Sequence, residues 1–264
     1  MTSRSDWPYP RVVAHRGGGT LAPENTLAPE NTLAALDEGA RRGHRMVEFD
    51  AKLSADDVTF LLHDDTVERT SNGQGAAAGM RYAALAALDA GAWRDARFAG
   101  ERMPTLEAAA ARCNALGLAA NVEIKPCPGR ERDTGRRVAA DAAAYWRGAA
   151  VPPLLSSFSF EALREARETA PELPRGMLYE TVPPDWHAQV VDALGCVSLH
   201  ADHTRLDETQ VRAIKAAGLR ILVYTVNDLA RARELVRWGV DAVCTDRIDL
   251  IGPHALDDVV QGAA

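Results

Sequence analysis

Carboxylate side chains occupy alternate positions in two apolar segments of this sequence. Glu48 and Asp50 are separated by one apolar residue in segment 46–50, and Glu123 lies between two apolar residues in segment 119–125. Because side chains of a β-strand alternate between its faces, each polar group projects from one face of its strand. Buried carboxylates are costly unless they pair with cations or bind a metal, and all-oxygen ligands favour Mg²⁺ or Ca²⁺ over zinc. The pattern predicts that the three carboxylates bind one divalent cation; structural ion pairs with arginine or lysine are the simpler alternative.

Two histidines follow apolar runs in a similar way. His15 ends the segment VVAH, His63 ends FLLH, and a polar loop follows each of them. Histidine titrates near neutral pH, so one imidazole can remove a proton while the other donates one. Arg16 and Lys125 could neutralise a phosphate, and arginine can bind it through two parallel hydrogen bonds. Together these groups indicate phosphodiester cleavage, although a lone histidine at a strand end is more often a hydrogen-bonded core residue.

The elements that must position these residues alternate along the chain between short apolar runs and helical patterns. Such alternation is typical of α/β folds with a mostly parallel sheet, and α/β barrels carry their active sites at the carboxyl ends of the strands. We expect strands at residues 12–15, 46–50, 59–63, 119–125, 154–158, 175–179, 196–200, 220–226 and 242–245. We expect helices at residues 32–42, 82–87, 105–116, 135–146, 160–169, 185–194, 207–217 and 229–238.

This order of elements favours an α/β fold with a single (β/α)8 TIM barrel, but it contains one strand too many. Segments 46–50 and 59–63 have no helix between them, so their connection must be irregular. A doubly wound open sheet is the alternative, and it is disfavoured because no GxGxxG loop follows the first strand. The polar, then glycine- and alanine-rich stretch after His63 predicts a small insertion over the barrel mouth. We expect one domain over residues 1–264, with a core at about 11–253.

Composition limits the classes of partner. The 264 residues are 47% hydrophobic, with a net charge of −7 and a pI of about 5.5, so the chain lacks the basic character of nucleic-acid-binding proteins. The four cysteines have no metal-ligand spacing, which indicates reduced thiols. We find no secretory signal and no apolar stretch of the roughly 18 to 20 residues that span a bilayer. We therefore expect a cytoplasmic protein that acts on a small molecule without membrane insertion; a homo-oligomer is left open.

A series of motifs resembles the glycerophosphodiester phosphodiesterase family in order and spacing. They are AHRGG, LAPENTLAAL, EFDAKLS, LLHDD, ERTSNG, NVEIKP, LLSSF, LVYTVN and CTDRID, and they extend from about residue 11 to residue 253. The chain is most similar to the small cytoplasmic bacterial members of that family. The resemblance implies a (β/α)8 barrel with an insertion after the strand ending at His63. It also implies hydrolysis of a glycerophosphodiester to glycerol 3-phosphate and an alcohol.

The resemblance also implies a role for each residue singled out above. His15 and His63 become the general acid/base pair, Arg16 and Lys125 contact the phosphate, and the three carboxylates hold one cation, Mg²⁺ or Ca²⁺. The attacking oxygen could come from water or from the substrate's own 2-hydroxyl. A lysophospholipase-D-like or phosphoinositide-lipase-like activity is the alternative among enzymes, but no membrane-docking segment is present. A non-catalytic barrel that binds glycerol phosphates is less favoured, because binding alone does not require two histidines.

One departure from the family pattern is the duplication of LAPENT at residues 21–26 and 27–32. A loop absorbs six extra residues for well under ~1 kcal/mol of closure entropy. Six residues added to a helix would instead rotate its apolar face by about 240°. The second copy also ends in Asn31-Thr32, which caps the predicted helix directly. We therefore predict that Glu30 lies beside the site and orients His15 or Arg16, while Glu24 lies in a surface loop.

Overall fold

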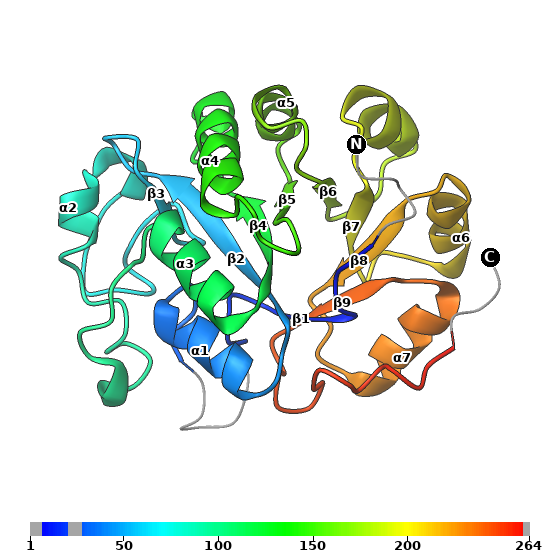
Figure 1. Cartoon of the computed structure of the whole chain (residues 1–264), viewed down its shortest axis with the longest axis horizontal. Helices are drawn as coiled ribbons and strands as arrows, with labels where there is room; N and C mark the ends of the chain where they lie inside the picture. The colour runs from blue at the N-terminus through cyan, green and yellow to red at the C-terminus, as the bar shows by residue number, and fades with distance from the viewer. Residues whose placement is uncertain (1–6, 21–27, 261–264) are drawn as a thin grey trace.

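Eight parallel strands close into a barrel within residues 7–20 and 28–260, which are the residues that this computed structural model describes. The first strand of the barrel pairs with the second and with the last, and this pairing closes the ring (Figure 1). The predicted (β/α)8 barrel is thus confirmed, and the open doubly wound sheet is wrong. The barrel strands are β1 (Val12–Ala14), β2 (Met46–Leu53), β4 (Ala119–Ile124), β5 (Leu154–Ser157), β6 (Arg175–Tyr179), β7 (Ser198–Asp202), β8 (Arg220–Tyr224) and β9 (Ala242–Thr245).

The surplus strand is β3 (Thr59–Leu61), which lies outside the barrel. It pairs antiparallel with the end of β2, where Leu53 lies opposite Thr59 and Ala51 lies opposite Leu61. An antiparallel pair can be joined by a short turn, which explains why no helix separates the two strands. His63 therefore follows β3, which is not one of the eight barrel strands. It still reaches the mouth because β3 runs back toward the site.

Six α-helices of the described residues cover the outside of the barrel (Figure 1). They are α1 (Leu33–Arg41), α3 (Leu106–Leu116), α4 (Glu131–Tyr145), α5 (Phe160–Thr169), α6 (Glu208–Ala216) and α7 (Leu229–Trp238). All but α3, which follows the insertion, come directly after a barrel strand. The helix expected at 185–194 is a π-helix, η3 (Ala188–Ala193). Helix α4 begins four residues before its predicted start, and Gly135 lies inside it. A Cβ on Gly135 would lie 2.3 Å from the carbonyl oxygen of Ala162 on α5, so glycine permits the close approach of the two helices.

Residues between β3 and α3 form a lobe at one side of the barrel, with a small apolar core of its own (Figure 1). We call residues 62–105 the insertion. Its ordered pieces are η1 (Ala77–Gly79), α2 (Tyr82–Leu85) and η2 (Ala96–Phe98). Its buried side chains include Leu62, Val67, Leu85 and Met103. The predicted insertion is thus a packed structure rather than a loose loop.

Alternate residues of each barrel strand face the core beneath the helices and the interior of the barrel. On β2, Val47 and Phe49 face outward into the core beneath the helices, whereas Met46 faces inward. The inward residues at the amino-terminal end of the barrel form an apolar cluster that we call the plug: Tyr9, Val13, Met46, Ala119, Leu154, Leu222, Ala242 and Cys244. Above the plug the inward positions become polar. Among the described residues, no helix is long and apolar enough to cross a bilayer.

A buried histidine occupies the polar middle of the barrel. His200 on β7 is fully buried, and its Nε2 lies 2.9 Å from the hydroxyl of Ser198. Gly176 on the neighbouring strand leaves room for the ring, because a Cβ there would lie 2.3 Å from Nε2. Burial lowers the pKa of His200 to about 3, so the folded barrel holds the neutral imidazole.

This burial predicts a loss of stability in mild acid. Below pH ~6.5 the unfolded chain binds a proton at His200 that the folded barrel excludes down to a pH of about 3. The free energy of unfolding should therefore fall by up to about 1.4 kcal/mol per pH unit through this residue alone. Urea unfolding of the wild type and His200→Gln between pH 7 and 4.5 measures the contribution. Equal slopes in the two proteins would show that His200 does not carry it.

Candidate active site

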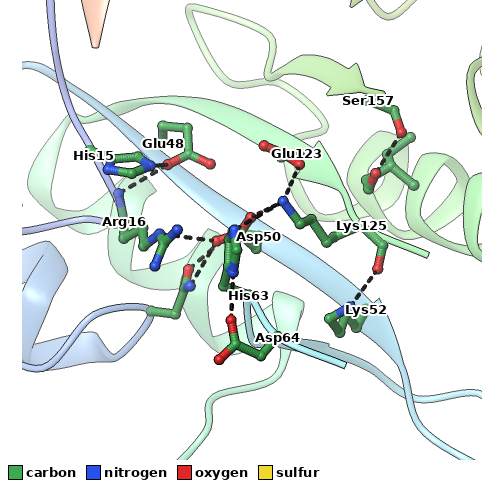
Figure 2. Close-up of polar contacts among 12 residues, drawn as sticks. His15, Arg16, Glu48, Asp50, Lys52, His63, Asp64, Glu123, Lys125 and Ser157 are labelled. Carbon is green, nitrogen blue, oxygen red and sulfur yellow. Dashed lines mark hydrogen bonds and ion pairs between the residues drawn. The ribbon is translucent and has the colours of Figure 1, made fainter. Parts of the chain in front are cut away.

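Three buried carboxylates converge at the carboxyl end of the barrel, as the alternation predicted. Glu48 and Asp50 project inward from β2, and Glu123 projects from β4, where it is paired in register with Asp50. One carboxylate oxygen of each lies within 4.8 Å of those of the other two. All three side chains are buried, with at most 9% of each residue exposed. Figure 2 shows them pointing toward one another among the other side chains of the site.

The electrostatics of the three carboxylates reflect their crowding. Burial, together with the charge of Asp50, raises the pKa of Glu48 to about 8 and also raises the pKa of Glu123. Burial acts in the same direction on Asp50, but Lys125, His63 and Arg16 outweigh it and lower the pKa of that carboxyl. Ionisation is thus favoured at Asp50 and opposed at the two glutamates, and added positive charge would favour it at all three.

These residues fit a divalent cation. The donors are all carboxylate oxygens, as Mg²⁺ and Ca²⁺ prefer. Glu48 Oε1 is buried and has no hydrogen-bond partner among the described residues. A buried carboxylate oxygen without a partner is costly, and a cation held between the three groups would satisfy it. The cluster is therefore a candidate metal centre.

His15 follows β1 and lies beside this cluster. Its Nδ1 is 2.7 Å from Asp246 Oδ1, and its Nε2 is 3.8 Å from Glu48 Oε2. Asp246 follows β9 and is positioned by Asn227, whose side-chain oxygen accepts a hydrogen bond from the backbone N–H of Asp246. Sequence reasoning did not single out Asp246, although it lies within the CTDRID motif. The only available signal was its position directly after an apolar strand.

His63 has a similar partner on the other ring nitrogen. Its Nδ1 lies 2.7 Å from Asp64 Oδ1, and its Nε2 lies 3.0 Å from the Lys125 ammonium. Because lysine can only donate, Nε2 accepts this bond and Nδ1 carries the proton that Asp64 accepts. Lys125 also donates to Glu123 at 2.9 Å. Both histidines thus use Nδ1 for an aspartate and turn Nε2 toward the site.

The two imidazoles differ in their preferred charge. Burial lowers the pKa of both rings. At His15 the hydrogen bond to Asp246 and the charge of Glu48 outweigh burial, and the pKa is raised. At His63 burial prevails, assisted by the positive charges of Arg16 and Lys125, and the pKa is lowered. The two imidazole pKa values are thus shifted in opposite directions, which suits one ring to donate a proton and the other to accept one.

Arg16 lies in a turn that also bonds to the carboxylates. Its backbone N–H donates to Glu48 Oε2 at 3.0 Å, and its Nε lies 3.8 Å from Asp50 Oδ2. Its NH1 donates to Glu30 Oε1 at 2.7 Å. Its Nε is buried and has no hydrogen-bond partner among the described residues. The predicted cations, Arg16 and Lys125, both border the carboxylate cluster.

The second LAPENT copy supplies two residues to the site. Glu30 is buried, and its Oε1 accepts a hydrogen bond from Arg16 NH1, so among the two predicted partners it contacts Arg16. Glu24, in the first copy, lies outside the described residues. Asn31 was not anticipated: its amide exchanges two hydrogen bonds with Asp50, at 2.9 and 3.0 Å. Thr32 caps α1 by accepting from the N–H of Ala35, as the helix placement required.

An aromatic side chain stands beside the polar groups at the mouth. Phe158, one residue beyond β5, is 41% exposed. Its ring lies 5.5 Å from the Lys125 ammonium and packs edge-on against Tyr224, with 5.8 Å between the ring centres. An exposed aromatic ring beside Lys125, which itself contacts the carboxylate cluster, suits a ligand with an anionic part and an apolar part.

Comparison with known proteins agrees with this geometry. The model of the glycerophosphoryl diester phosphodiesterase family matches residues 15–250. A glycerophosphodiester phosphodiesterase of Caldanaerobacter subterraneus is 30% identical over 241 residues, covering 89% of this chain and 93% of the relative. The Bacillus subtilis protein YhdW, named as a candidate glycerophosphodiester phosphodiesterase, is 32% identical over 246 residues, covering 91% of this chain and 96% of the relative.

Solved structures give the same result. A phosphodiesterase from Oleispira antarctica, determined in complex with its product sn-glycerol-3-phosphate, superimposes with a TM-score of 0.85 and 36% identity. The match covers 95% of this chain and 98% of that one. The family model, the relatives and this structure all extend over most of the barrel and include its site. The chain therefore belongs to the glycerophosphoryl diester phosphodiesterase family, a family of hydrolases.

Proposed function

We propose that the protein hydrolyses glycerophosphodiesters to glycerol 3-phosphate and an alcohol, with a divalent cation and a histidine acid/base pair. One observation carries the proposal: His15 and His63 each bind an aspartate through Nδ1 and turn Nε2 toward the same carboxylate cluster. Two imidazoles oriented in this way can serve the two proton transfers of a single displacement. The product bound to the Oleispira antarctica enzyme supports the choice of glycerol 3-phosphate.

The side chains divide the work by charge. Arg16 and Lys125 would bind the non-bridging oxygens of the phosphate, and the guanidinium can do so bidentately. One imidazole would take the proton from the attacking oxygen at Nε2, and the other would donate a proton to the oxygen of the departing alcohol. Asp64 and Asp246 hold the rings so that Nε2 faces the reacting atoms. Glu48, Asp50 and Glu123 would hold Mg²⁺ or Ca²⁺, which supplies positive charge against the charge that develops on the phosphate oxygens.

Removal of the metal should abolish the activity. With glycerophosphocholine as substrate, EDTA should lower the release of glycerol 3-phosphate by at least about a hundredfold, and excess Mg²⁺ or Ca²⁺ should restore it. Glu123→Gln should lower activity to a similar extent and weaken binding of the metal measured by calorimetry. Glu107→Gln, which changes an exposed glutamate on α3, is the control. Full activity in EDTA together with unchanged metal binding by Glu123→Gln would refute the metal site.

Each histidine should be necessary. His15→Ala and His63→Ala should each lower kcat by about 10²-fold or more, and the double variant should lose little beyond either single one, because both act in one step. His254→Ala is a matched control, since His254 forms the same kind of 2.7 Å bond to an aspartate, Asp257, on an exposed surface. Turnover near that of the wild type in either site variant would return that histidine to a structural role.

A further inference from the structure

Arg69, in the insertion, binds two carboxylates at the edge of the site. Its guanidinium donates to both oxygens of Glu30 at 2.8 Å each. It also donates to both oxygens of Asp64, at 2.6 and 3.0 Å. The side chain is 45% exposed, so it lies at the mouth rather than in the core of the insertion. One planar group thus makes four charge-assisted hydrogen bonds to carboxylates from two separate segments.

Each of these carboxylates holds one residue of the proposed machinery. Glu30 accepts from Arg16 at 2.7 Å, and Asp64 accepts from His63 at 2.7 Å. We propose that Arg69 is a positioning residue that sets two groups at once: it keeps Arg16 open to the phosphate through Glu30, and it orients His63 through Asp64. This inference deepens the proposed function and rests on it.

Arg69 acts on Arg16 through Glu30, because it occupies the carboxylate oxygen of Glu30 that Arg16 does not bind. Arg16 NH1 and Arg69 NH2 share Glu30 Oε1, whereas Oε2 is bound by Arg69 NH1. Without Arg69, Oε2 would become free in a side chain that is only 5% exposed. A guanidinium favours both oxygens of a carboxylate over one. Arg16 would therefore turn into a two-bonded pair with Glu30 and lose the donors that the phosphate needs.

Arg69 acts on His63 through Asp64, because it restrains the orientation of the Asp64 carboxylate. Asp64 is about a quarter exposed and follows His63 directly in the chain. Arg69 fixes both of its oxygens, and with them the direction of the bond to His63 Nδ1. A short exposed aspartate without that anchor can rotate into water, and the tautomer and orientation of the imidazole would then no longer be fixed. Nε2 of His63 would face the reacting atoms for only part of the time.

The test compares Arg69→Ala with Arg69→Lys, Arg69→Ala/Glu30→Gln and the control Arg102→Ala. Arg102 is exposed in the same insertion, and its hydrogen bonds within the described residues go to the carbonyls of Ala87 and Leu88, so its loss loosens the insertion without touching a group of the site. Arg69→Ala should lower kcat about tenfold or more, through His63, and raise KM about tenfold, through Arg16. Arg69→Lys should stay impaired, because an ammonium cannot bind two carboxylates bidentately. If Arg69→Ala does not fold, Arg69→Lys is compared with the wild type and with Arg102→Ala instead.

The double variant Arg69→Ala/Glu30→Gln separates the effect on Arg16 from the effect on His63. Glu30→Gln removes the charge that captures Arg16, so in the Arg69→Ala background it should lower KM toward the wild-type value and leave kcat low. Unchanged kcat and KM in Arg69→Ala would overturn the proposal. Equal losses in Arg102→Ala would also overturn it, since they would show that the effect comes from the stability of the insertion.

Two measurements without turnover distinguish failure of this inference from failure of the proposed function. Side-chain ¹⁵N spectra of the wild type should show His63 as the Nδ1–H tautomer, and Arg69→Ala should show a mixture. Calorimetry should show weaker binding of glycerol 3-phosphate to Arg69→Ala than to Arg102→Ala. If the wild type releases no glycerol 3-phosphate from any diester, the proposed function fails while these results still decide the role of Arg69. An unchanged tautomer with unchanged affinity would exclude it.

Discussion

The crowding of three carboxylates inside a closed barrel is the constraint on which the rest of this structure depends. Glu48, Asp50 and Glu123 lie in a region where water cannot screen them, and like charges at this separation oppose one another's ionisation. Toward the plug, the neighbouring inward positions of the described residues are apolar or neutral and do not compensate for this charge. The compensation has to come from the carboxyl end, and the elements gathered there are arranged accordingly.

The compensating groups come from segments far apart in the sequence. Arg16 follows the first strand, Asn31 precedes the first helix, and Lys125 follows β4. Parallel strands all point their carboxyl ends the same way, so residues that follow different strands meet at one face. The antiparallel β3 brings the insertion to that face as well. Lys52, fully buried on β2 two residues after Asp50, bonds to Asp65 in the insertion and to the carbonyl of Lys125. The charged site thus also fastens the insertion to the barrel.

Much of this arrangement could be predicted from the sequence, because it follows from periodicity. The alternation along β2 and β4 placed the three carboxylates on the inner face, and the register of the capped helix selected Glu30. What could not be predicted depends on contacts between segments. The direction of β3 is set by its pairing with β2, and the π-helical turn η3 has the same apolar pattern as an α-helix. Asp64, Asp246 and Arg69 lie in turns where no periodicity indicates a direction, so their hydrogen bonds to the site appear only in three dimensions.

The apolar plug closes the barrel at its amino-terminal end, so the interior is open only at the carboxyl end of the strands. Tyr9, Met46 and Leu154 are among the side chains that fill its amino-terminal end, so the carboxylates can be reached from one side alone. A substrate and its products would therefore share one opening, at the carboxyl end of the barrel where Phe158 is exposed. The product that dissociates last from the base of this opening would therefore prevent the next substrate from binding.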